Sequence, residues 1–238
     1  MQRYFAFNKD NNKFTLSIDD TYHITKVMRM NIGDLVEVIY DKKLYISKII
    51  ELLPEVVVEI EEEKNDFNEL PINVTICQSL VKESKMDLIL QKSTELGAYS
   101  FIPLKVKNSI IKGTESDFSK KVIRWQRIIK EASEQSKRNI IPLCNSVLSI
   151  KELVKLDYDL KILCTVNELS RSFKNILQNN INCDTMIIVV GPEGGFTHDE
   201  EEYLISHGFI SASLGNLVLR TETASLCALS MINYELES

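Results

Sequence analysis

The chain has 238 residues, of which 44% are hydrophobic and 26% are charged, and its formal net charge is −6. These proportions are typical of a soluble globular protein with one large or two modest domains. No run of about 18 apolar residues predicts a membrane span, and the N-terminal stretch lacks the apolar core of a signal peptide. Five scattered cysteines without a CxxC pair, together with only three histidines, predict reduced thiols, a cytoplasmic protein and no metal site.

Residues 1–70 are predicted to be rich in β-strands. The alternation of apolar and polar residues indicates strands at 3–7, 34–40, 44–52 and 56–60, and a short helical turn capped by Asp19 or Asp20. Several short strands with one helix favour a small barrel. The acidic stretch Glu61 to Glu69, which ends at Pro71, has the composition of a linker.

From Ile72 onward the pattern changes to strands that alternate with helices, which predicts an α/β fold with a mainly parallel sheet. Strands are expected at 73–80, 99–104, 161–166, 185–190 and 210–215. Helices are expected at 84–96, 118–136 and 221–236, with a further one opening at Thr197. Trp125 falls on the apolar side of the second helix and is predicted to lie in the core or in an interface, in preference to stacking on a base.

Charge is unevenly distributed along the chain. Residues 51–70 carry eight acidic side chains and one lysine, whereas residues 105–138 carry ten lysines and arginines and four acidic side chains. Nucleic-acid binding depends on such a local basic surface and not on the net charge. Solvated helix faces would produce the same composition, so both interpretations stay open.

A glycine-rich turn follows the apolar run at 185–190. The sequence GPEGGFTHDE supplies Gly191, Gly194 and Gly195, and Thr197 with Glu200 is typical of a capping box that opens a helix. A strand, a glycine turn and a helix N-terminus together hold anionic or nucleotide-like ligands in many α/β folds. A tight turn needs glycine for steric reasons alone, so this motif is ambiguous by itself.

A second glycine-ended strand leads to Gly215 and then to the sequence Arg220-Thr-Glu-Thr-Ala224 at the start of the last helix. Two such strands predict one binding crevice at the carboxyl edge of the sheet. The sequence contains no P-loop, no GxGxxG after the first strand and no GxSxG, which argues against nucleoside triphosphates, an ordinary dinucleotide site and hydrolase chemistry.

GPEGG together with LGxxxLRTETA resembles the RsmE family of SPOUT methyltransferases. The resemblance extends to HITKVMRMNIGD at 23–34, KMDLILQKSTELG at 85–97 and WQRIIKEASEQSKRNIIP at 125–142, so it covers nearly the whole chain in order. It implies an S-adenosylmethionine-dependent enzyme that methylates N3 of a uridine in small-subunit (16S) ribosomal RNA. Leu217 departs from the family, whose members usually carry a basic residue there.

The resemblance also implies an architecture. Residues 1–70 would form a PUA-like RNA-binding β-barrel, and residues 71–238 a SPOUT domain with a deep trefoil knot. It further implies a homodimer with the final helix in the interface, where Leu226 and Leu229 would be buried. Two alternatives remain open: a methyltransferase of related fold that acts on another RNA such as transfer RNA, and a non-catalytic RNA-binding assembly factor.

The matching positions supply the expected site residues. Uridine N3 must lose its proton, which calls for a carboxylate base and a cation for the developing charge, and the choices are Glu222 and Arg220. These two could instead form an ion pair at the helix start. The cofactor is expected to contact Leu163, Thr165, Gly191, Glu193, Gly194, Gly195, Leu214, Gly215, Leu219, Thr223 and Ala224. RNA is expected to contact Arg3, Lys26, Arg29, Lys82, Lys85, Lys105, Lys107, Arg124, Arg127 and Arg138.

Overall fold

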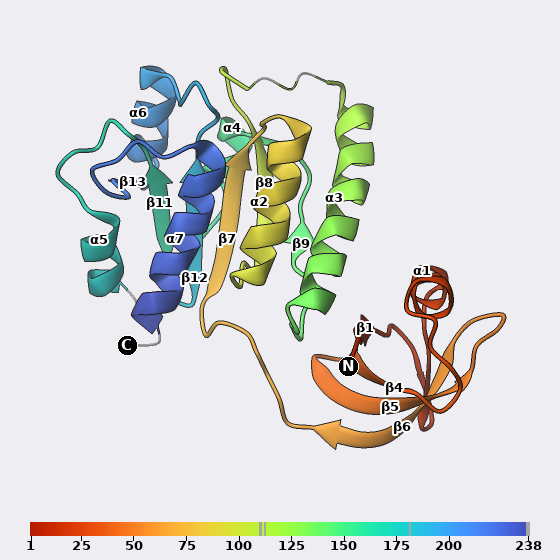
Figure 1. Cartoon of the computed structure of the whole chain (residues 1–238). Helices are drawn as coiled ribbons and strands as arrows, with labels where there is room; N and C mark the ends of the chain where they lie inside the picture. The colour runs from red at the N-terminus through yellow and green to blue at the C-terminus, as the bar shows by residue number, and fades with distance from the viewer. Residues whose placement is uncertain (110, 112, 181, 237–238) are drawn as a thin grey trace. The chain divides into compact units, whose positions relative to one another are not determined.

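The computed structural model describes residues 1–109, 111, 113–180 and 182–236. The chain divides into two compact units (Figure 1). The first comprises Met1–Glu69 and Ser133–Ile141, and the second comprises Leu70–Ala132 and the chain from Pro142 onward. The α/β class is confirmed, with a largely antiparallel sheet in the first unit and a parallel sheet in the second.

The first unit is built on a sheet with the strand order β1-β4-β5-β6-β3-β2. Its strands are β1 (Arg3–Phe5), β2 (Lys9–Asp10), β3 (Lys13–Thr15), β4 (Leu35–Tyr40), β5 (Lys43–Glu51) and β6 (Val57–Lys64). The short pair β2 and β3 escaped prediction, because two or three residues are too few for a recognisable alternation. Strand β6 runs into the acidic stretch, so the residues at 61–63 form an exposed strand end.

The helical turn of the first unit consists of α1 (Ile18–Tyr22) followed by the π-helical turn η1 (His23–Val27). The side chain of Ser17, and not that of Asp19 or Asp20, caps α1 by accepting a hydrogen bond from the Asp20 backbone N–H at 3.1 Å. Ile24 points from η1 into an apolar core that also contains Tyr4 and Phe14.

The segment 133–141 is fixed to the first unit by buried charges. Arg3 forms an ion pair with Glu37 at 2.8 Å and donates to the carbonyl oxygen of Arg138 at 3.2 Å. Glu69 pairs with Arg138 and accepts from the backbone N–H of Asn139 at 2.8 Å. Buried charges need such partners, and both arginines therefore have structural roles.

The second unit contains a parallel sheet with the order β10-β8-β7-β12-β11-β13, and β9 pairs with β8. The strands are β7 (Asn73–Ser79), β8 (Ser100–Lys105), β9 (Leu143–Cys144), β10 (Leu148–Ser149), β11 (Leu160–Cys164), β12 (Thr185–Val190) and β13 (Ile210–Ala212). The helices are α2 (Glu83–Glu95), α3 (Glu115–Gln135), α4 (Ile150–Leu153), α5 (Phe173–Asn180), α6 (His198–Ser206) and α7 (Thr221–Leu236). Sequence analysis missed the short elements β9, β10, α4 and α5.

Helices cover both faces of this sheet, as parallel sheets require. On one face, Leu153 of α4 and Leu204 of α6 pack with strand residues such as Ile187. On the other face lie α7 and its neighbour α2 (Figure 1). Trp125 of α3 is buried, as predicted. None of the described helices is long and apolar enough to span a membrane.

Candidate functional site

The central strands of the second unit end beside two adjoining cavities. Strands β12, β11 and β13 are neighbours in the sheet, and because they are parallel their carboxyl ends meet at one edge. A cavity of about 710 Å³ is lined by the glycine turn at 191–196, by the segment 164–167 and by residues 218–221. A second cavity of about 280 Å³ shares the lining residues Cys164, Thr165, Val166, Val218, Leu219 and Ala224 with it. We call the two together the strand-end cleft.

Most of the predicted cofactor residues line this cleft. The larger cavity contains Thr165, Gly191, Glu193, Gly194, Gly195, Leu219 and Ala224, and the smaller contains Leu214 and Gly215. Leu163 precedes the lining residue Cys164 in β11 and is fully buried in the apolar core. Thr223 is exposed on the first turn of α7 and lines neither cavity.

A buried hydrogen-bond network holds the cleft's walls together. The hydroxyl of Thr221 donates to the Gly191 carbonyl oxygen at 2.6 Å and accepts from Nε2 of Gln78 at 2.9 Å. Oε1 of Gln78 in turn accepts from the Ser225 hydroxyl at 2.6 Å. The end of β7, the glycine turn and the first turns of α7 are thereby joined at one point.

The glycine turn has a backbone conformation that favours glycine and is held by hydrogen bonds to its carbonyl oxygens. Gly195 has a φ of +66°, and a Cβ added there would meet no atom within 4 Å, so its surface faces open space. The carbonyl oxygens of Gly194 and Gly195 each accept from Nδ2 of Asn108 at 3.1 Å. Thr197 and Glu200 form the predicted capping box at the start of α6. This part of the motif is confirmed.

Two carboxylates that sequence analysis did not identify support the opposite wall. Glu201 is buried and accepts from the Thr165 hydroxyl at 2.6 Å and from the Asn167 amide at 3.1 Å. Glu168 accepts from the hydroxyls of Ser211 and Ser170, which lowers its pKa to about 2. Thr165, which donates to Glu201, and Ser211, which donates to Glu168, are distant in the sequence, although Ser170 lies two positions from Glu168. Local sequence patterns therefore do not indicate the contacts that join these elements.

Lys85 of α2 brings two acidic side chains together at the rim of the cleft. Its Nζ lies 3.1 Å from Oε1 of Glu193 and 3.2 Å from Oε2 of Glu222. The contact with Glu193, and to a smaller extent that with Glu222, raises the pKa of Lys85. The ammonium therefore stays charged. We predicted an RNA contact for Lys85, but the structure places it between the two carboxylates of the site.

Glu222 stands behind Lys85 and does not itself line the cleft. Burial favours its neutral form, but a backbone N–H, Lys85 and Arg220 outweigh burial and lower the pKa of Glu222. Its Oε2 accepts no hydrogen bond from the described residues, although Lys85 is within ion-pair distance. One carboxylate oxygen therefore keeps unused acceptor capacity.

Arg220 lines the cleft and is exposed. Within the described chain its guanidinium forms no ion pair, so the alternative of a simple Arg220–Glu222 pair is not seen. Its five N–H donors remain available to a ligand.

The predicted RNA-binding residues divide into three groups. Arg3 and Arg138 are buried in the ion pairs described above, so we no longer assign them to RNA. Arg124 is partly exposed and pairs with Glu83 and Asp87 of α2. Exposed cations remain at Lys26 and Arg29 in the first unit, and at Lys82, Lys105, Lys107 and Arg127 in the second.

Comparison with known proteins shows to which family this site belongs. The family described as RNA methyltransferase domain matches residues 68–233. The ribosomal RNA small subunit methyltransferase E of Bacillus subtilis is 36% identical over 100% of this chain and 98% of its own length. The chain belongs to this RNA methyltransferase family. The protein of the same name from Buchnera aphidicola (Acyrthosiphon pisum) is 31% identical over 96% of this chain and 91% of its own length.

Solved structures agree over the full length. A putative methyltransferase from Legionella pneumophila, in complex with the bound cofactor SAM, has a TM-score of 0.90 and 28% identity, covering 98% of this chain and 97% of its own. A ribosomal RNA small subunit methyltransferase E from Neisseria gonorrhoeae, bound to S-adenosyl methionine, has a TM-score of 0.88 and 28% identity, covering 99% and 98%. The similarity of this family member therefore includes both units.

The pairing of Lys85 with Glu222 leads to a pH prediction. In the wild type burial raises the pKa of Glu222, but a backbone N–H, the Lys85 ammonium and Arg220 together hold it below its ordinary value. We expect Lys85→Met to raise the pKa of Glu222, so that the carboxylate takes up its proton at a higher pH. Carbon-detected NMR titration of the labelled glutamate carboxyl groups measures this. Lys82→Met, which removes an exposed lysine one turn away, serves as the control, and an equal shift in both variants would contradict the pairing.

Proposed function

We propose that this protein transfers a methyl group from S-adenosylmethionine to N3 of a uridine in small-subunit ribosomal RNA. Family membership supports methyl transfer to RNA, and the names of the curated relatives support the ribosomal substrate. The observation that carries the proposal is the strand-end cleft, where an open glycine turn lies beside one free guanidinium and a Lys85-bridged pair of carboxylates.

The cleft fits the proposed cofactor in both size and chemistry. Ligand pockets of roughly 300–1,000 Å³ are usual for small molecules, and the larger cavity of about 710 Å³ falls in this range. Gly191, Gly194 and Gly195 would let backbone groups approach the cofactor, and Leu214, Leu219 and Ala224 would provide apolar contact. When bound, S-adenosylmethionine supplies an electrophilic methyl group on a sulfonium.

The protein's own part in the reaction concerns a proton and a developing charge. Uridine N3 is a poor nucleophile until its proton leaves, and Glu222 is the proposed acceptor of that proton. As the proton departs, negative charge spreads to the uracil carbonyl oxygens, to which Arg220 can donate hydrogen bonds from a planar fork. The target base has to be unpaired, because N3 lies on its pairing edge.

Lys85 explains how a carboxylate behind the cleft wall can serve as base. The ammonium has two acceptors, Glu193 at 3.1 Å and Glu222 at 3.2 Å. It can therefore keep its ion pair with Glu193 while Oε2 of Glu222 turns to the substrate. Lys85 is a positioning residue in this scheme, because its ammonium lies within ion-pair distance of both carboxylates.

The substrate is tested by methylating unmodified small subunits with the purified protein and labelled S-adenosylmethionine. We expect mass spectrometry of the nucleosides to show 3-methyluridine. Transfer RNA, assayed in parallel, distinguishes an enzyme of related fold with another substrate. A protein that binds RNA but not the cofactor would be a non-catalytic assembly factor, and methylation on C5 or on ribose would refute the proposed atom.

The cofactor site is tested at Gly195. A Gly195→Val side chain would enter the open space of the cleft, so S-adenosylmethionine affinity in calorimetry should fall at least about tenfold. Gly208→Val is the matched control, because Gly208 also has a positive φ of +91° and no atom within 4 Å of an added Cβ, but lies outside the cleft. Similar affinities of the two variants would place the cofactor elsewhere.

The catalytic pair is tested by two conservative changes. Glu222→Gln keeps the shape of the side chain but removes the base, so single-turnover methylation should fall by roughly two or more orders of magnitude. Arg220→Lys should also lower this rate substantially, because an ammonium cannot reproduce the fork. Cofactor affinity should stay near the wild-type value in both. A wild-type rate for Glu222→Gln would exclude it as the base without affecting the methyltransferase assignment.

The proposal includes a homodimer that acts in the cytoplasm. Leu229 is already fully buried within its own chain, so it cannot contribute to the interface that we predicted there. The apolar side chains of Val166, Leu169, Leu217 and Val218, which are 63% to 92% exposed around the smaller cavity, form a better candidate for a self-complementary surface. Sedimentation equilibrium should show a dimer at micromolar concentration that Leu169→Lys weakens, because Leu169 is 92% exposed in this surface. A fully active monomer would contradict the proposed dimer.

A further inference from the structure

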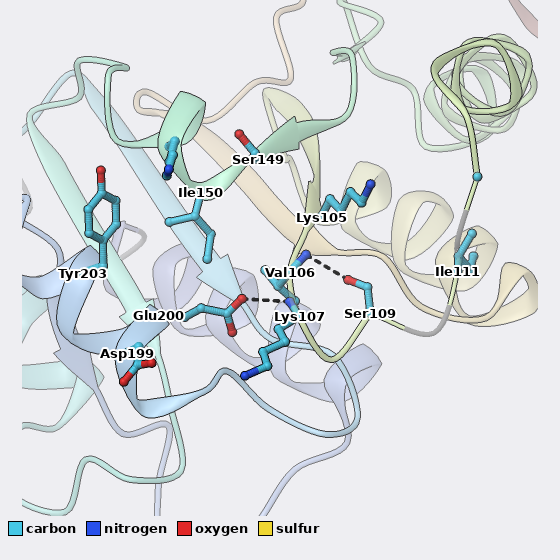
Figure 2. Close-up of a pocket in the computed structure, with 12 residues that line it drawn as sticks. Lys105, Val106, Lys107, Ser109, Ile111, Ser149, Ile150, Asp199, Glu200 and Tyr203 are labelled. Carbon is cyan, nitrogen blue, oxygen red and sulfur yellow. Dashed lines mark hydrogen bonds between the residues drawn. The ribbon is translucent and has the colours of Figure 1, made fainter.

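A second cavity, separate from the strand-end cleft, lies at the carboxyl ends of β8 and β10. Its volume is about 790 Å³, and none of its lining residues lines the cleft (Figure 2). Ile150 of α4 and Tyr203 of α6 line one side of it, and the segment that follows β8, from Lys105 to Ser109, lines another. We call it the β8-end pocket.

The segment from Lys105 to Ser109 lines the pocket and is also hydrogen-bonded to the glycine turn of the cleft. Lys105, Val106 and Lys107 line the pocket, and the next residue, Asn108, holds the carbonyl oxygens of Gly194 and Gly195 at 3.1 Å on the cleft side. The Lys107 backbone N–H also donates to Oε1 of Glu200 at 2.8 Å (Figure 2). A ligand in the pocket would therefore lie directly beside the turn that borders the reaction site.

The pocket combines apolar walls with more basic than acidic side chains. Val106 and Ile150 supply aliphatic surface, and Tyr203 is 37% exposed, with His207 packed at a ring distance of 4.3 Å. Lys105, Lys107 and Lys151 form no ion pair within the described chain. Of the two acids present, Glu200 is engaged in the cap of α6 and Asp199 lies in that helix's first turn, where the helix dipole stabilises a negative charge.

We propose that the β8-end pocket holds an unpaired nucleobase of the RNA next to the target uridine, with the adjoining phosphate at Lys105 and Lys107. The inference rests on the proposed function, because it takes RNA as the substrate. An aromatic ring with aliphatic neighbours is what a stacked base requires, and lysines at the rim suit the phosphates on either side of it. Extruding the target base leaves its neighbours unstacked, so a second base pocket stabilises the reactive conformation of the RNA.

The test measures RNA binding directly, apart from methylation. The probe is a fluorescent hairpin from the small-subunit RNA that contains the target uridine, in versions with an abasic site at each flanking position. By fluorescence anisotropy, Tyr203→Ala should weaken binding of the intact hairpin by roughly tenfold to a hundredfold. Tyr99→Ala is the matched control, since Tyr99 is 42% exposed just before the amino end of β8, at the opposite edge of the sheet.

A double-substitution cycle identifies the base. At one flanking position the abasic site should weaken wild-type binding by the same factor as Tyr203→Ala, and the two changes combined should cost little more than either alone. If the losses of affinity from the abasic site and from Tyr203→Ala were fully additive at every position, or if Tyr203→Ala bound RNA with unchanged affinity, the proposed base site would be refuted. The proposed function would still stand if the wild type methylates the RNA. A wild type that neither binds nor methylates the RNA would overturn the proposed function as well.

A second pair of variants tests the phosphate. The double change Lys105→Gln and Lys107→Gln should reduce the slope of log affinity against log salt by roughly two units, whereas Lys174→Gln on α5 should leave the slope unchanged. Cofactor affinity, measured by calorimetry, should stay within twofold of wild type in Tyr203→Ala and in the double variant. Loss of cofactor binding in both would mean that the pocket only supports the glycine turn, which would also refute a base site.

Discussion

The whole site depends on one hydroxyl group. Thr221 accepts from Gln78 and donates to the carbonyl oxygen of Gly191, so it joins the end of β7, the glycine turn and the start of α7. Parallel strands are connected through helices, and nothing local fixes the loops at their carboxyl ends to one another. The buried hydrogen-bond network of Gln78, Thr221 and Ser225 fixes these loops to one another. Because its surroundings have a low dielectric constant, removing any one partner would cost free energy of folding. Arg220 and Glu222 flank this hydroxyl in the sequence, so the bridge also positions them.

The charges around the cleft are balanced locally. Glu193 and Glu222 carry like charges, and the Lys85 ammonium lies 3.1 Å from one carboxylate and 3.2 Å from the other. The single cation therefore offsets the repulsion between them. On the other wall, Glu168 and Glu201 accept hydrogen bonds from hydroxyl and amide groups, and these bonds join the segments that form the wall. The two pairs of carboxylates therefore differ: Glu193 and Glu222 share one cation, whereas Glu168 and Glu201 accept hydrogen bonds from hydroxyl and amide groups.

Sequence analysis succeeded where the determinants are local. The apolar run at 185–190, the capping box of Thr197 and Glu200, and the glycine turn are each specified by residues a few positions apart. It failed where the partner is distant: charge alone placed Arg3 and Arg138 on RNA, whereas Glu37 and Glu69 bury them. The same limitation concealed the partners of Lys85 and the roles of Glu168 and Glu201. The knot and the exact domain boundary, which no periodicity encodes, stay predictions.

The segment 105–109 gives the two cavities a physical connection. Its backbone contacts the cap of α6 through Glu200, and its Asn108 side chain fixes the glycine turn through two carbonyl oxygens. Its lysines carry no ion pair among the described residues, so a phosphate at Lys107 would act one residue from Asn108. RNA that favours this arrangement of the segment would also favour the present position of Gly194 and Gly195, whose carbonyl oxygens Asn108 holds. By reciprocity, a ligand that stabilises the glycine turn would favour the same arrangement of Lys105 and Lys107 for RNA.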